Sequence, residues 1–292
     1  MNGYHPKSVL APTDFSEHSL LAVRYAAAIA SRCGSRLTII HAHRFEPPLE
    51  FTSRQIDRLA RDEQRDRRAL HRQLREHATE AVGTEVQAEM VVVEAAPVEA
   101  IMAEAERVSA DLIVMGTHGR SGVNRLLMGS VAENVVRRAL CPVLTVRQKE
   151  HGFIVEGQIQ LQRILLPLTP DPASMQAASV ACGLSKAFGA ELTVIHSIEP
   201  GREAAPEPFS WIPEDMRSHC TFRTVVRKGD AAEQIVTQAR EHNSDLIVIA
   251  GRHRPFLEAT VFGSTTVRVM RHAPCPALIV PVRPHSSTAQ ER

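Results

Sequence analysis

The chain has 292 residues, of which 43% are hydrophobic and 23% charged, a composition typical of a globular protein. Its 34 basic residues are balanced by 33 acidic ones and only 4% of residues are aromatic, which argues against nucleic-acid binding. No apolar run approaches the roughly 18 residues of a membrane span, and residues 1–7 lack a signal-peptide core. The five cysteines include no Cys-x-x-Cys pair. We therefore expect a cytoplasmic protein with reduced thiols.

Two sets of matches align the first half of the chain with the second. The segment GSRLTIIH at 34–41 recurs as GAELTVIH at 189–196, identical at five of eight positions and 155 residues later. The segment DLIV at 111–114 recurs at 245–248, which is 134 residues later. These matches indicate duplication of a whole domain, with a second copy that is 21 residues shorter.

Each copy alternates short Val- and Ile-rich runs with longer amphipathic segments, the pattern of parallel strands joined by crossover helices. In the first copy the predicted strands are 7–12, 36–42, 85–93, 111–116 and 142–147, and the predicted helices are 17–32, 53–81, 98–108 and 130–140. In the second copy the predicted strands are 162–167, 191–196, 221–227, 245–250 and 277–281. We expect an α/β protein with two tandem doubly wound domains, each a five-stranded parallel sheet flanked by helices.

The predicted units are domain 1 at 1–148, a linker at 149–160, domain 2 at 161–283 and a disordered tail at 284–292. Two helix starts can be predicted from single residues. Ser16 is a favourable N-cap for the first helix, and Asp171 followed by Pro172 opens the corresponding helix of the second copy. The charged helix predicted at 53–81 falls in the interval that the second copy lacks. Its mixed charges suit a solvated face better than a nucleic-acid surface.

The most informative segment is 116–131, which contains four glycines between a predicted strand and a predicted helix. It lies beyond the carboxyl end of a parallel strand, where open α/β sheets bind ligands. Gly129 and Ser130 begin a helix whose first amides and dipole favour phosphate. The segment has neither the dinucleotide-binding nor the Walker pattern. The residues alone leave two interpretations open, an anion-binding loop and an ordinary flexible turn.

The pattern Gly-x2-Gly-x9-Gly-Ser formed by Gly116, Gly119 and Gly129–Ser130 resembles the nucleotide loop of the ATP-binding branch of universal stress proteins. The segment VLAPTDFS at 9–16 resembles the opening strand of that family, and CPV at 141–143 resembles its closing strand. The resemblance covers nearly the whole chain as a tandem pair. It implies a Rossmann-like, adenine nucleotide alpha hydrolase-like fold in each copy.

The resemblance also implies an ATP site in domain 1. Asp14 would accept hydrogen bonds from the ribose hydroxyls, and Ala42 would offer backbone groups to adenine. The implied nucleotide-binding residues are Pro12, Asp14, Ala42, Gly116, Gly119, Gly129, Ser130 and Val131. Further candidates are Thr13, Met115, Thr117, His118, Arg120 and Arg125. Mg²⁺ would bridge the phosphates without a site formed by protein groups alone. The alternative for Asp14 is a helix cap, for Met115 core packing, and for the loop side chains a solvated surface.

The second domain departs from this pattern. Ala250 and His253 replace the first two loop glycines, and Thr169 replaces the carboxylate of Asp14, whereas Gly263–Ser264 keeps the start of the last helix. We expect this domain to bind ATP weakly or not at all, so that each chain has one nucleotide site.

Two recurring residue types have simpler interpretations than catalysis or metal binding. His41 recurs as His196, which favours a structural role at the end of a strand. Cys141 recurs as Cys275, each before a proline at the start of a buried strand, which favours burial as a small apolar residue. No catalytic residue is predicted, because no nucleophile or metalloprotease motif is present.

Three functions remain open. The first is an ATP-binding regulatory or stress-response module without dedicated catalysis. The second is a slow Mg²⁺-dependent ATPase, whose loop and cation would stabilise phosphate charge. The third is a nucleotide-free scaffold that binds a protein or another small ligand. The resemblance further implies that the final strands, 143–147 and 277–282, pair the domains into an intramolecular pseudo-dimer that can form homodimers. Neither nucleic acid nor membrane is an expected partner.

Overall fold

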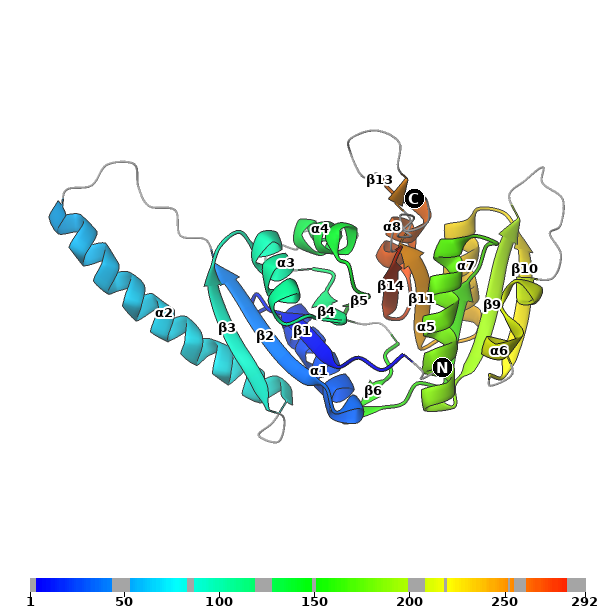
Figure 1. The fold of residues 1–292 in the computed structure, drawn as a ribbon, viewed down its shortest axis with the longest axis horizontal. Coiled ribbons are helices and arrows are strands. Elements are labelled where there is room, and N and C mark those ends of the chain that lie inside the picture. The colour runs from blue at the N-terminus through cyan, green and yellow to red at the C-terminus, as the bar shows by residue number, and fades with distance from the viewer. Residues whose placement is uncertain are drawn as a thin grey trace, which may run out of the picture. The chain divides into compact units, whose positions relative to one another are not determined.

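The structure, a computed structural model, describes residues 4–43, 53–82, 87–118, 128–148, 151–198, 208–217, 220–251, 253–254 and 261–282. The chain divides by its internal contacts into two compact units, one mainly of residues 5–135 and 143–160 and the other mainly of residues from 161 onward. Within the described residues each unit holds a parallel sheet of five strands flanked by helices, as the sequence predicted (Figure 1).

The first sheet has the strand order β5-β4-β1-β2-β3, with every neighbouring pair parallel. Its strands are β1 (Ser8–Pro12), β2 (Arg36–His43), β3 (Ala88–Glu94), β4 (Leu112–Gly116) and β5 (Val143–Val146). Its helices are α1 (Glu17–Cys33), α2 (Ser53–Val82), α3 (Pro97–Arg107) and α4 (Ser130–Arg138). Helix α1 packs across the central strands and against α2, and α3 packs on β2.

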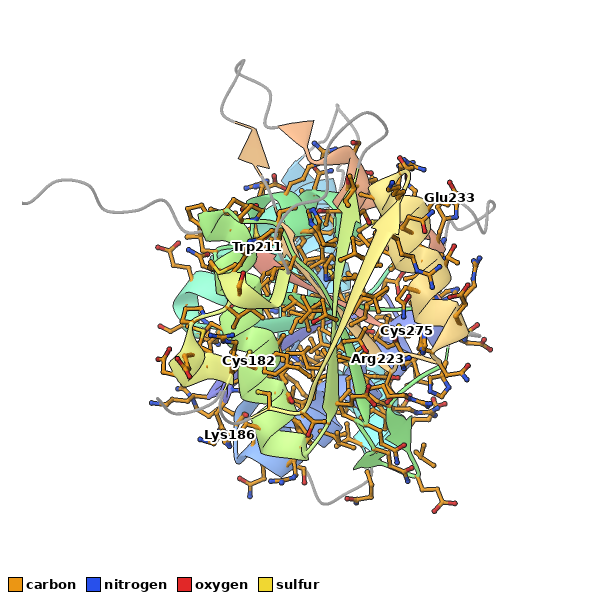
Figure 2. All side chains as sticks on the ribbon, turned by 90° about the vertical axis from the view of Figure 1, so that its right-hand side faces the viewer. Cys182, Lys186, Trp211, Arg223, Glu233 and Cys275 are labelled. Carbon is orange, nitrogen blue, oxygen red and sulfur yellow. The ribbon has the colours of Figure 1, made fainter. Side chains whose placement is uncertain are left out.

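The second sheet repeats this order position for position, as β14-β11-β8-β9-β10. Its strands are β8 (Arg163–Pro167), β9 (Glu191–Ile198), β10 (Phe222–Lys228), β11 (Leu246–Gly251) and β14 (Ala277–Pro281). The main helices are α5 (Pro172–Phe188), α7 (Ala231–Glu241) and α8 (Ser264–His272). Figure 2 shows Cys182 and Lys186 of α5 on one side of this sheet and Glu233 of α7 on the other.

The central strands form because their side chains are apolar on both faces and both faces are covered by helices. All five residues of β1 are buried, as are all six of β11. The edge strands β3 and β10 keep several exposed side chains, because each has a neighbouring strand on one side. The core of each unit therefore lies around β1 and β4, and around β8 and β11.

Helices α1 and α5 begin and end by the same local rules. Ser16 accepts a hydrogen bond from the Ser19 amide at 3.2 Å, and Asp171 accepts one from the Ser174 amide at 3.1 Å. Both helices end at a glycine in the left-handed region, Gly34 with φ 62° and Gly189 with φ 66°. Glycine is favoured there because it has no Cβ to clash. These observations confirm the two predicted N-caps.

Several small elements carry no signal in the sequence analysis. A hairpin of β6 (Ile154–Val155) and β7 (Gln158–Ile159) lies in the predicted linker, and Phe153 beside it packs edge-on against Tyr25, with ring centroids 4.9 Å apart. Between β9 and β10 lie a 3-10 helix, η1 (Pro208–Trp211), and a short helix, α6 (Glu214–Arg217). A second hairpin joins β12 (His253–Arg254) to β13 (Val261–Phe262). The predicted tail lies outside the described residues. Among the helices that the structure describes, none is both long and apolar enough to cross a membrane.

Candidate functional site

The candidate site lies where the strand order of the first sheet reverses. From β1 the chain proceeds to β2 and β3 on one side, and then crosses to β4 and β5 on the other. Doubly wound sheets bind ligands at the carboxyl ends of the strands at such a switch point. Because β1 pairs with both β2 and β4, the strand ends carrying Pro12, Ala42 and Gly116 are neighbours. The fold therefore brings together predicted residues from three separate segments.

Thr13 holds the turn that follows β1. Its amide donates to the Ile40 carbonyl at 2.8 Å, and its own carbonyl accepts from Nδ1 of His41 at 2.8 Å. A carbonyl can only accept, so Nδ1 of His41 carries the proton. The Thr13 hydroxyl lies 2.9 Å from both the Ser19 hydroxyl and Nε2 of His77, in a buried cluster. Thr13 was a candidate ligand contact, and its polar groups are engaged within the protein.

The next two residues shape the rim of the site. Oδ1 of Asp14 accepts from the amide of Ser16 at 3.1 Å and from its hydroxyl at 2.5 Å. Phe15 adopts a left-handed φ of 63°, and its ring lies 4.1 Å from that of His41 and 5.6 Å from that of His77. Asp14 is half-buried. These bonds give the carboxylate the turn-forming role that the sequence left open, and its contact with a ribose stays a prediction.

Ala42 lies at the carboxyl end of β2, two residues beyond Ile40. The Ile40 carbonyl accepts from Thr13, so the backbone of Ile40 is directed toward β1. Backbone direction alternates with a period of two along a strand. The N–H and C=O of Ala42 therefore point to the same side of β2 as those of Ile40. They are directed beyond Pro12, where β1 ends. This direction suits the adenine contact that the family resemblance implies.

The segment after β4 begins with a glycine in close contact with α1. A Cβ on Gly116 would lie 3.0 Å from the carbonyl oxygen of His18 and 3.1 Å from its carbon, so a larger residue would displace that backbone. The amide of Thr117 donates to Val146 at 3.1 Å, and the amide of Gly129 donates to the Thr117 carbonyl at 2.8 Å. The second bond joins the two ends of the 118–128 segment beside the start of α4.

The other predicted residues of this segment differ in burial and in contacts. Ser130 is exposed and Val131 half-buried in the first turn of α4, while Met115 is buried, which favours core packing. Nδ1 of His118 lies 2.8 Å from the Thr117 hydroxyl, and its ring centroid is 5.4 Å from that of His18. The predicted residues that lie outside the described part of the chain are Gly119, Arg120 and Arg125.

The second unit keeps the framework of this site and changes its exposed groups. Nδ1 of His196 lies 2.9 Å from the Leu168 carbonyl, which repeats the bond from His41 to Thr13. Ala250 stands in place of Gly116, and its carbonyl accepts from the Thr266 hydroxyl at 3.1 Å. The ring of Trp211 packs edge-on against His196 at 4.9 Å.

Sequence reasoning missed the part that α2 plays in the first unit. Leu74 and Ala78 are buried, and His77 between them is 9% exposed. The signal was a histidine three residues after Leu74, within the apolar stripe of a charged helix. Its partner Thr13 is 64 residues away, so the pairing could not be predicted from spacing.

Comparison with known proteins gives a consistent result. A model of the universal stress protein family matches residues 6–147 and 216–281, well over half of the chain. A universal stress protein of Thermus aquaticus is 36% identical over 142 residues, covering 48% of this chain and 98% of the relative. The relative MJ0531 from Methanocaldococcus jannaschii is 35% identical over 146 residues, covering 49% of this chain and 82% of its own. A universal stress protein structure from Archaeoglobus fulgidus covers 95% of this chain and 99% of its own, with a TM-score of 0.71 at 20% identity, a likeness of fold.

Proposed function

Since the chain belongs to the universal stress protein family, we propose that its first domain binds an adenine nucleotide, ATP with its Mg²⁺, and acts as a nucleotide-responsive regulatory module. The observation that carries the proposal is the convergence of three segments at the switch point of the first sheet. They are the Pro12–Ser16 turn, the end of β2 at Ala42, and Gly116 with the hydrogen bond from Gly129 to Thr117.

Each segment would contact a different part of the ligand. The Ala42 backbone, directed past the end of β1, would meet the adenine edge, and Asp14 would meet the ribose. The exposed Ser130 hydroxyl and the first amides of α4, including that of Val131, would hold the phosphates. Within the described residues no three His, Cys, Asp or Glu side chains could hold a metal ion together. We propose that Mg²⁺ is carried by the triphosphate, where it offsets phosphate charge.

The direct test is the number of nucleotides bound per chain, measured by isothermal titration and by native mass spectrometry with MgATP, ADP and cAMP. We expect one site. The variant Asp14→Asn keeps an oxygen that can accept from Ser16, so the turn is retained while the carboxylate is lost. Loss of a charged hydrogen bond to the ribose should weaken binding about tenfold or more. Gly119→Val should remove most binding as well.

The matched control places the same residue at the equivalent position of the second domain. Thr169→Asn should leave both affinity and stoichiometry unchanged. Two tight sites per chain would contradict the proposed difference between the domains, and unchanged affinity in both Asp14→Asn and Gly119→Val would place the pocket elsewhere. Phosphate release measured in the same samples distinguishes binding from slow hydrolysis, because hydrolysis at this site must fall with Asp14→Asn.

A further inference from the structure

The connection between β9 and β10 packs back onto the second domain at several points. Trp211 contacts His196 edge-on, with ring centroids 4.9 Å apart, and Ile212 is fully buried. Helix α6 packs against α5. Figure 2 shows Trp211 and Cys182 on the side of the sheet that α5 covers. We call the described residues 208–217 and 220–221 the cover segment. Its Trp211 lies against the strand end that corresponds to the nucleotide site of domain 1, and residues 220–221 lie beside the start of β9, where β10 begins.

The end of the cover segment brings two thiols together. Sγ of Cys220 lies 3.5 Å from the carbonyl oxygen of Cys182 and 3.7 Å from that of Met216. Met216 belongs to α6, so Cys220 contacts both α5 and α6. Cys182 is buried in α5, whereas Cys220 is half-buried. Burial, together with the adjacent thiol of Cys220, raises the pKa of Cys182 to about 12. Both thiols are free cysteines in this structure.

We propose that Cys182 and Cys220 form a reversible redox site, in which hydrogen peroxide closes a disulfide that fastens the cover segment to α5. The more exposed Cys220 reacts first. Its thiolate attacks one oxygen of peroxide, the O–O bond breaks, and the departing hydroxide takes up the thiol's proton to give water and a sulfenic acid. The sulfur of Cys182 then attacks the sulfenic sulfur, and the released hydroxyl leaves with the Cys182 proton as a second water. Two thiols are oxidised and one peroxide is reduced to two waters.

The position of the pair determines what the disulfide would do. Cys182 and Cys220 are 38 residues apart in sequence, and the bond would close a loop that contains β9, Trp211 and α6. Closing the loop restricts the opening of the cover segment away from His196. The first domain has no such device, since Ala27 stands at the position of Cys182 and α2 replaces the cover segment. The inference is therefore specific to domain 2 and does not depend on nucleotide binding.

The pH dependence of closure follows from the chemistry of the second step. The thiolate is the nucleophile, and burial raises the pKa of the Cys182 thiol and so lowers its thiolate fraction near neutral pH. Disulfide formation after the first oxidation should therefore be slow near neutrality and accelerate as the pH rises.

The test uses the full chain, hydrogen peroxide as oxidant, alkylation of the remaining thiols and mass spectrometry of a non-reduced digest. We expect a peptide joining Cys182 to Cys220, loss of two alkylatable thiols, and recovery of both with dithiothreitol. Cys182→Ala is the matched variant, because Ala27 shows that alanine fits the equivalent turn of α1. It should abolish the joined peptide, whereas Cys33→Ser should leave it intact.

The consequence is read from the only tryptophan of the chain, Trp211. Acrylamide quenching of its fluorescence should fall on oxidation of the wild type and stay unchanged in Cys182→Ala. Absence of the joined peptide from folded, oxidised protein would overturn the site. A joined peptide without any change in quenching would overturn its action on the cover segment. Cys220→Ser provides a second variant, so that misfolding of one variant does not decide the result.

Discussion

The turn after β1 and the turn after β8 perform the same structural task with the polar groups exchanged. In domain 1 the carboxylate belongs to Asp14 and the helix cap is the hydroxyl of Ser16, which donates to it at 2.5 Å. In domain 2 the hydroxyl belongs to Thr169 and the cap is the carboxylate of Asp171, with the same 2.5 Å bond between them. The fold therefore requires a hydrogen bond between the first and third residues of this turn. Either of the two residues can carry the charge.

That freedom separates the requirements of folding from those of binding. Domain 1 holds its carboxylate at the rim of the switch point, whereas domain 2 holds it inside the cap of α5. The histidine that bonds the preceding carbonyl is kept in both. The covering elements differ more, with His77 of the long α2 in domain 1 and Trp211 of η1 in domain 2. We infer that duplication preserved the sheet and its turns while the groups at the candidate site diverged.

The largest expected effect tests whether the two domains are separate folding units. Leu10 in β1 and Leu165 in β8 occupy equivalent, fully buried positions. Each Leu→Ala change leaves a cavity and should destabilise its own domain by about 2–5 kcal/mol. Denaturant unfolding is followed by circular dichroism for both domains and by Trp211 fluorescence for domain 2.

The fluorescence midpoint should move with Leu165→Ala and stay in place with Leu10→Ala. Equal shifts in both variants would mean that the chain unfolds as one cooperative unit. That result would contradict the independent folding of the two domains.

The next effect concerns the buried cluster around Thr13, which domain 2 replaces with Leu168. Thr13→Leu removes the hydroxyl that lies 2.9 Å from both Ser19 and His77, and leaves buried polar groups without their partner. It should destabilise domain 1 by about 1–3 kcal/mol, measured as a shift in the thermal or denaturant midpoint.

Thr13→Ser is the control, because it keeps the hydroxyl and removes one methyl group. It should cost clearly less than Thr13→Leu. If the two variants destabilise domain 1 equally, packing and not the hydroxyl decides the stability of this turn. The exchange of Thr13 for Leu168 would then have little effect on the difference between the domains.

The predictable part of the fold was the part governed by local rules. Ser16, Asp171 and the glycines that end α1 and α5 act within a few residues of themselves, so the sequence reports them directly. The hairpin in the predicted linker was missed because strands of two residues have no periodicity. In the structure its turn at Glu156–Gly157 adopts left-handed φ angles of 51° and 75°.

The candidate site was predictable in its position and less so in its bonds. Strand order places the ends of β1, β2 and β4 at one edge of the sheet, and the alternating pattern of strands and helices suggests that order. The contact of Gly116 with His18 and the cluster of Thr13 with His77 depend on how α1 and α2 dock. Those docking geometries follow from packing across the sheet, which no spacing rule encodes.

The smallest expected effect compares the starts of α7 and α3. Asp230 caps α7 by accepting from the Glu233 amide at 3.0 Å, and it pairs with Arg268 at 2.6 Å. The corresponding α3 begins after Ala96, whose side chain has no acceptor. Asp230→Ala should therefore cost about 1 kcal/mol, and Ala96→Asp should recover part of such a contribution in domain 1.

The pH dependence distinguishes a charged cap from a packing effect. The Arg268 hydrogen bond, with that of the Glu233 amide, lowers the pKa of Asp230 below its ordinary value. A lowered pKa means that the stabilisation is fully present above the ordinary carboxyl pKa and is lost as the pH falls through the lowered one. The difference in unfolding free energy between wild type and Asp230→Ala should therefore shrink in acid, as measured by denaturant titrations from neutral pH downward. A difference that stays constant with pH would show that the charge of Asp230 contributes nothing to the stability of this helix start.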